Sequence, residues 1–372
     1  MECKEINPEN SVMKKQERNS NLELLRIVSI IMIISHHYAV HGGWTITNEL
    51  SLNRVIIQFL SLGGKLGVNC FVLITGYFMV NSIFSVKKLL KIMRQVFFYS
   101  VTIMILFKLF KISDIGISEI IESFFPIIFY KYWFATTYVL LYILTPYLNK
   151  FINSLTCKEH KQLLIVLTIL LSAIPTFTNT SLGTGNVMWF VFLYLIAGYL
   201  RKYPHSFFDR KKFFFLMFAI GYIFIFSSVI ILDVLGLRID IFSTYATYFI
   251  EMNELPLLFC SITLFLYFRN IDIGSNKIIN RISATTFGIY LIHDNDLMRN
   301  YLWNNIAQNN SYYYSHWLFL HAIITILLIF IVCMIIDYIR IVFIEKTLFS
   351  LVDNKWNDIS WFEVCNKYTD KH

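Results

Sequence analysis

The sequence predicts an all-α integral membrane protein, a polytopic bundle of about ten transmembrane helices with both termini in the cytoplasm. Of its 372 residues, 56% are hydrophobic and only 15% are charged, whereas charged residues make up roughly a quarter of an ordinary soluble domain. This composition excludes a soluble globular protein, and it excludes disorder, which requires low hydrophobicity. The apolar stretches are continuous rather than alternating, which favours helices over a β-barrel.

Ten stretches are candidates for membrane-spanning helices, each of which needs about 20 mostly apolar residues. They cover residues 22–40, 55–80, 89–110, 132–148, 163–177, 187–200, 213–232, 245–268, 284–297 and 317–339. The sixth and the ninth are short by this measure, and the eighth is interrupted by Glu251, Glu254 and Pro256.

The basic residues set the predicted orientation. With ten spans and an inner N-terminus, 25 of the 32 Lys and Arg residues fall on the inner side, as the positive-inside rule requires. The same rule accounts for the net charge of +8, so no nucleic-acid partner is expected. We expect a multi-pass cell-membrane protein with a cytoplasmic segment at residues 1–20, one membrane domain at 21–345 and a cytoplasmic tail at 346–372.

The six cysteines show neither a C-x-x-C pair nor a zinc-type spacing with His. In the predicted topology Cys3, Cys157 and Cys365 face the cytoplasm, where thiols stay reduced. We therefore expect no disulfide bond and no metal.

The first predicted span contains two ionisable residues, Arg26 and His37, eleven positions apart. Eleven steps of about 100° bring both onto one face of a helix, about 16 Å apart along its axis. Each has a plain structural alternative, Arg26 as an anchor paired with Glu23 and His37 as a packing histidine. Together on one stripe they favour a functional pair that faces a cavity, because ionisable groups are costly in a membrane.

Two more histidines lie close to His37 in the sequence. His36 is about 100° round the helix and is not expected to share the site of His37. His41 is one turn further on, where it either orients His37 or is an interfacial histidine.

Further motifs follow the first span in a fixed order. They are Gly67-Val68-Asn69 with Thr75-Gly76-Tyr77, the basic run Lys87-Lys88-Leu89-Leu90-Lys91-Ile92-Met93-Arg94, Tyr132-Trp133-Phe134 with Tyr142 and Pro146, and Ser283 with Phe287-Gly288-Ile289-Tyr290-Leu291-Ile292-His293. With Glu23, Arg26 and His37 in the first span, this order and spacing over residues 21–345 resembles membrane-bound acyltransferase family 3. Asn69 stands where the family usually has Asp, and Lys91 replaces the first Arg of a basic pair.

The resemblance implies transfer of an acyl group from acyl-CoA, acetyl-CoA in first place, to a hydroxyl of a cell-envelope or capsular polysaccharide or its lipid-linked precursor. It implies His37 as the general base with Arg26 and Glu23 beside it, Lys88, Lys91 and Arg94 on the phosphates of coenzyme A, and Trp133, Tyr290 and His293 on the substrate. The chemistry agrees, because a desolvated imidazole stays neutral and a neutral imidazole accepts a hydroxyl proton.

Several alternatives stay open. The basic run is also what a cytoplasmic membrane anchor looks like, and His293 is equally a structural partner of Asp294. Aromatic residues in the outer loop at 299–317 suit either a carbohydrate or the membrane interface. A lipid-linked glycan flippase or exporter would use the same charged residues without acyl transfer, and a glycan polymerase is the weakest reading. Within the enzyme class, succinyl transfer is open beside acetyl transfer, and the oligomeric state is not predicted.

Overall fold

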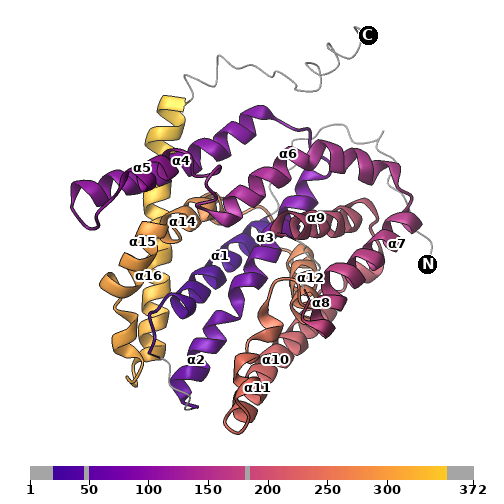
Figure 1. Ribbon diagram of the computed structural model, residues 1–372. Helices are drawn as coiled ribbons and strands as arrows, with labels where there is room; N and C mark the ends of the chain where they lie inside the picture. The colour runs from indigo at the N-terminus through magenta and orange to yellow at the C-terminus, as the bar shows by residue number, and fades with distance from the viewer. Residues whose placement is uncertain (1–19, 46–49, 181–184, 350–372) are drawn as a thin grey trace.

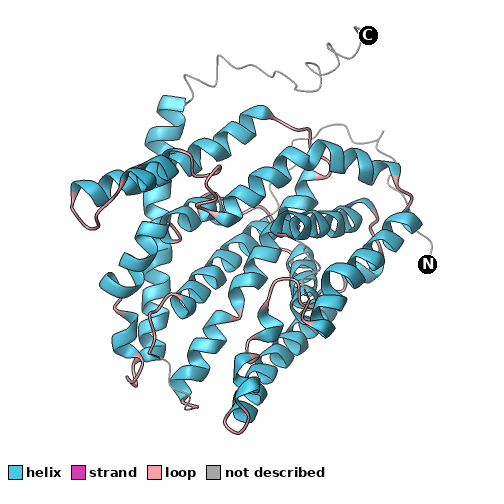
Figure 2. Ribbon diagram, in the orientation of Figure 1, coloured by secondary structure: helices cyan, strands magenta, loops and turns pink. Residues whose placement is uncertain are grey.

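The computed structural model describes residues 20–45, 50–180 and 185–349, and these are mostly helical (Figures 1 and 2). No strand occurs within those ranges, so the predicted all-α class is confirmed. The predicted cytoplasmic segments at residues 1–20 and 346–372 fall almost wholly outside the described backbone and side chains.

Seven helical segments in the described ranges are long and apolar enough to cross a membrane. They are Ser20–Val40, Leu52–Met79, Val86–Leu109, Cys157–Thr178, Lys211–Gly236, Asp240–Asn270 and Leu318–Glu345. This confirms a polytopic membrane bundle. The number of ten spans and the cytoplasmic position of the termini stay predictions.

Most of the predicted spans correspond to observed helices, and some are divided between two helices. The chain runs through α1 (Ser20–Val40), α2 (Leu52–Ser61), α3 (Gly63–Met79), α4 (Val86–Leu109), α5 (Ile117–Phe124), α6 (Trp133–Ser154), α7 (Cys157–Thr168), α8 (Ile174–Thr178), α9 (Asn186–Lys202), α10 (Lys211–Gly236), α11 (Asp240–Thr244), α12 (Leu255–Asn270), α13 (Lys277–Ser283), α14 (Thr286–His293), α15 (Asp296–Asn300) and α16 (Leu318–Ile339). Helices α6 and α9 cover the predicted fourth and sixth spans.

The predicted ninth span, residues 284–297, is not one helix. Helix α14 ends at His293, and α15 begins at Asp296 after a corner at Asn295. The Asn295 side chain accepts hydrogen bonds from the backbone N–H groups of Leu297 and Met298, which is the capping geometry that starts a new helix. At the corner, the Asp294 carbonyl accepts a hydrogen bond from Arg299 and the Asn295 side chain donates one to Tyr132.

Helix α1 lies in the middle of the bundle (Figure 1) and packs against α2, α3, α12, α13, α14 and α16. Its side chains Leu25, Ile30 and Tyr38 are fully buried. Contact with α3 is very close, since a methyl group on Gly67 would come within 2.6 Å of the Ser29 carbonyl oxygen. The side chains of α1 therefore pack against neighbouring helices or face an internal cavity.

One prediction about the cysteines is wrong. Cys157 is disulfide-bonded, whereas Cys70, Cys260 and Cys333 are buried free thiols. The redox argument from the predicted topology did not anticipate this bond.

Candidate active site

A cavity of about 770 Å³ runs through the middle of the bundle along one face of α1. Its lining includes Arg26, Ile30, Ile33 and His37 from α1 and His41 just after it, which recur every three or four residues as one face of a helix does. From Arg26 to His41 this face rises about 22 Å, more than half of a bilayer's hydrocarbon core of about 30 Å. Arg26 and His37 thus line one cavity, as their spacing predicts.

The cavity has three parts, which follow from the order of the lining residues along α1, α3 and α14. The His37 end contains His36, His37, His41, Lys65, Glu251, Asp294 and Arg299. The Arg26 end contains Arg26, Thr75, Lys91, Gln95, Ser283 and Ala284. Between them along α1 and α3 lie the apolar residues Ile30, Ile33, Val68 and Phe71, with Phe134 from α6, and we call this section the apolar waist.

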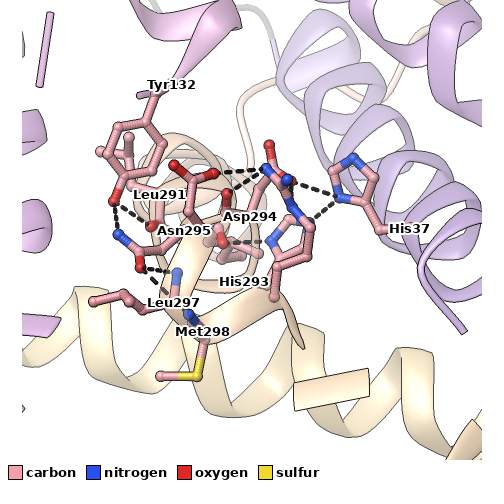
Figure 3. A network of polar contacts seen from close by, with 11 residues as sticks. His37, Tyr132, Leu291, His293, Asp294, Asn295, Leu297 and Met298 are labelled. Atoms are coloured by element: carbon pink, nitrogen blue, oxygen red, sulfur yellow. Dashed lines mark hydrogen bonds and ion pairs between the residues drawn. The ribbon is translucent and has the colours of Figure 1, made fainter. Parts of the chain in front are cut away.

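His37 is held by a chain of hydrogen bonds that fixes its proton (Figure 3). The Nδ1 atom of His293 lies 2.6 Å from the Ile289 carbonyl oxygen. A carbonyl only accepts, so His293 Nδ1 carries the proton and its Nε2 is an acceptor. His37 Nδ1 lies 3.0 Å from that Nε2 and must donate to it. The lone pair of a neutral His37 is therefore on Nε2, which is left for a ligand.

An ion pair stands beside this chain. Asp294 Oδ1 is 3.7 Å from His37 Nδ1 and accepts a hydrogen bond of 3.0 Å from Arg299 Nε. Arg299 Nη2 also donates to the Asp294 carbonyl oxygen at 3.0 Å. Asp294 is only 2% exposed, so its charge needs this partner. The carboxylate is close enough to stabilise an imidazolium if His37 takes up a proton.

The corner between α14 and α15 is fixed from α6. Asn295 Nδ2 donates to Tyr132 Oη at 2.6 Å, and Tyr132 Oη donates to the Leu291 carbonyl at 3.2 Å (Figure 3). Both residues are almost completely buried. These bonds fix the positions of His293 and Asp294 relative to His37.

The structure overturns the expectation that His36 stands apart from His37. His36 lines the same cavity, and the two rings lie 5.7 Å apart between centroids. At the break between α2 and α3, Ser61 and Gly64 contact His36 and line the cavity beside it.

At the other end, Arg26 is bound to Glu23 through Nη1 at 3.0 Å to both carboxylate oxygens. Glu23 also accepts a hydrogen bond from the Ser283 hydroxyl. The acidic residue of the motif thus ties α1 to the end of α13. Arg26 is both the anchor partner of Glu23 and a lining residue of the cavity.

Of the three basic residues predicted to bind the donor, one lines the central cavity. Lys91 lines the cavity and pairs with Glu345. Lys88 is exposed, and neither Lys88 nor Arg94 is among the lining residues. Ala284, at the Arg26 end, also borders a shallow pocket of about 260 Å³ lined by Lys277, Asn280 and Arg281. These two basic residues were missed in the sequence because they look like ordinary positive-inside residues.

The predicted substrate residues Trp133 and Tyr290 line the cavity. His293 is not among the lining residues and instead forms a hydrogen bond with His37. Lys65 Nζ lies over the Trp133 ring, 5.4 Å from its centroid. The buried Tyr290 hydroxyl makes no hydrogen bond of standard geometry within the described part of the chain, and the Phe134 backbone and the Asp294 carboxylate are polar groups within its reach. Such a buried hydroxyl in a cavity wall suits a ligand oxygen.

His37, His41 and Asp294 place donor atoms within 4.8 Å of one another, a spacing that could hold a cation. However, Asp294 is engaged by Arg299 and His37 Nδ1 by His293. These two atoms already have partners, so a cation would have to bind through the remaining atoms of His37 and Asp294. Burial lowers the pKa of His41, just beyond α1, to about 4, and this keeps its imidazole neutral at physiological pH.

Comparison with known proteins agrees with this geometry. A search of curated proteins and a search of solved structures gave no match. One family model, described as an acyltransferase domain, matches residues 19–338 and includes every cavity-lining residue named above. The chain therefore belongs to this acyltransferase family.

Proposed function

We propose that this membrane acyltransferase transfers an acetyl group from acetyl-CoA to a hydroxyl of a cell-envelope or capsular polysaccharide, or of its lipid-linked precursor, with His37 as the general base. The observation that carries the proposal is the single cavity that joins Arg26 and Lys91 at one end to His37 at the other. An exporter would not need a histidine whose proton position is fixed by a buried hydrogen-bond chain.

The reaction follows from the tautomer of His37. Its Nε2 takes the proton of the acceptor hydroxyl as that oxygen attacks the thioester carbonyl. The C–O bond forms, the C–S bond breaks, and the imidazolium returns the proton to the leaving thiolate. His37 Nδ1–H stays bonded to His293 throughout, and Asp294 offsets the transient positive charge.

The carbonyl oxygen of the thioester gains negative charge in this attack, and it needs a hydrogen-bond donor. The Tyr290 hydroxyl supplies one, because it lies buried in the cavity wall with its ring 6.4 Å from that of His293. This gives a definite role to one of the substrate residues expected from the sequence.

The donor enters at the Arg26 end. The apolar waist suits the acyl group and its slender pantetheine arm, whereas the phosphates need cations. Lys91 lies at the cavity mouth, and Lys277 and Arg281 lie just beyond Ala284. Charge-assisted hydrogen bonds from these groups hold the phosphates, and Lys88 and Arg94 contribute to the surrounding positive field.

The test is donor-dependent labelling of glycan. Membranes that contain the full chain are incubated with acetyl-CoA labelled in the acetyl group and with surface glycan extracted from cells lacking the gene. We expect label in the glycan with the protein present and none without it. Succinyl-CoA in a parallel reaction identifies the acyl group, and unlabelled glycan combined with blocked glycan export in the deletion strain would favour the exporter.

A further inference from the structure

His36 has the same built-in tautomer control as His37, from a different source. Its Nδ1 lies 2.7 Å from the Ser61 carbonyl oxygen. Ser61 is the last residue of α2, where helix carbonyls lack an intrahelical partner. Because the carbonyl only accepts, Nδ1 carries the proton and Nε2 carries the lone pair.

The ring of His36 is also fixed by packing. It lies flat against Gly64, where a methyl group would come within 2.2 Å of His36 Cγ. Only glycine at this position leaves room for the ring. His36 Nε2 has no hydrogen-bond partner among the residues the structure describes, and the side chain lines the cavity.

The wall around His36 is distinct from the wall behind His37. It is made by α3, α6 and the segment before α12, through Lys65, Trp133, Thr247 and Glu251. Lys65 and Glu251 bring one positive and one negative charge, so this part of the wall has no net charge from them. Such a wall suits a neutral ligand rich in hydroxyl groups better than an anion.

We propose that His36, Lys65, Trp133 and Glu251 form the subsite for the acceptor sugar, and that His36 Nε2 accepts a hydrogen bond from a second hydroxyl beside the one that His37 deprotonates. The inference rests on the proposed function. The two imidazole rings, 5.7 Å apart between centroids, face one sugar residue with two acceptor atoms of defined tautomer. His36 takes no proton in the reaction; it selects which hydroxyl lies at His37.

Two substitutions separate this role from a structural one. His36→Asn keeps an N–H group near Nδ1 for the Ser61 carbonyl but removes the acceptor at Nε2. His36→Gln places a polar group near Nε2 but loses the Ser61 contact. The full chain in membranes is assayed at varied acetyl-CoA and at varied glycan extracted from cells lacking the gene.

We expect His36→Asn to raise the KM for glycan about 3- to 10-fold, the effect of losing one hydrogen bond to a ligand, with the KM for acetyl-CoA unchanged. His36→Gln stays closer to wild type, and Glu251→Gln also raises the KM for glycan. The subsite is overturned if His36→Asn leaves the glycan KM unchanged, if the acetyl-CoA KM moves instead, or if His36→Gln alone loses activity together with folded protein. A wild-type chain that labels no glycan would defeat the proposed function itself, and the subsite with it.

Discussion

The two ends of the cavity are built in different ways. At the His37 end, His37, His293 and Asp294 are all buried. His37 of α1 is hydrogen-bonded to His293 of α14, and Asp294 lies 3.7 Å from His37 and accepts a hydrogen bond from Arg299 of α15. At the Arg26 end, the side chain of Arg26 is 24% exposed and that of Lys91 is 56% exposed, and both pair with carboxylates. Reaction chemistry needs a proton on one particular atom, whereas binding phosphates needs only positive charge. Substitutions of His37 and of His293, which orients it, should therefore change the rate of transfer, and substitutions at the Arg26 end should change the donor concentration required.

The largest effect is expected from His37→Ala. Loss of the base should lower the rate of transfer by about 100- to 10,000-fold, while the amount of protein in the membrane stays near wild type. His316→Ala removes an exposed histidine outside the cavity and serves as the matched control. Normal transfer by the His37→Ala protein would disprove the assigned role.

A smaller loss is expected from His293, which orients the base without touching the substrate. His293→Ala should lower the rate roughly 10- to 100-fold, the effect of a lost buried hydrogen bond. His293→Gln, whose amide oxygen can accept from His37 Nδ1, should retain more activity than His293→Asn, which keeps only the bond to the Ile289 carbonyl. The reverse order of the two amide variants would contradict the tautomer argument.

Tyr290→Phe tests the proposed hydrogen bond from the Tyr290 hydroxyl to the thioester carbonyl. Removing one hydroxyl should lower kcat by about 10-fold without a matching change in either KM. The apolar ring contacts stay, so the variant should fold normally. An unchanged kcat would remove Tyr290 from the chemistry and leave it a packing residue.

The smallest effects are expected at the Arg26 end. Lys277→Gln and Arg281→Gln should each raise the KM for acetyl-CoA about 2- to 5-fold, because exposed charge contacts are weak and screened. The effect should shrink at high salt. Lys88→Gln, which changes an exposed lysine outside the cavity lining, is the control; an equal effect there would mean that only overall charge matters.

The sequence predicts the helical membrane class, the shared face of Arg26 and His37, and the pairing of Glu23 with Arg26, because hydropathy and the helical repeat are local properties. It does not predict that His36 lines the cavity, since that depends on the break at Leu62 and the approach of Gly64 from α3. Arg299 was also missed, because its partner Asp294 meets it only through the corner at Asn295. Residues 63 and 64, both glycine within an apolar run, are the one signal that pointed to a close helix approach.

The apolar waist has a consequence for the energy supply of the cell. A water-filled passage of this length would let protons leak across the membrane and dissipate the gradient that drives ATP synthesis. The side chains of Ile30, Ile33, Val68, Phe71 and Phe134 offer no polar atom to a hydrated ion, and apolar surfaces in a pore disfavour water and ions. Under the proposed function, this apolar section would admit the uncharged acyl group while opposing the passage of ions along the cavity.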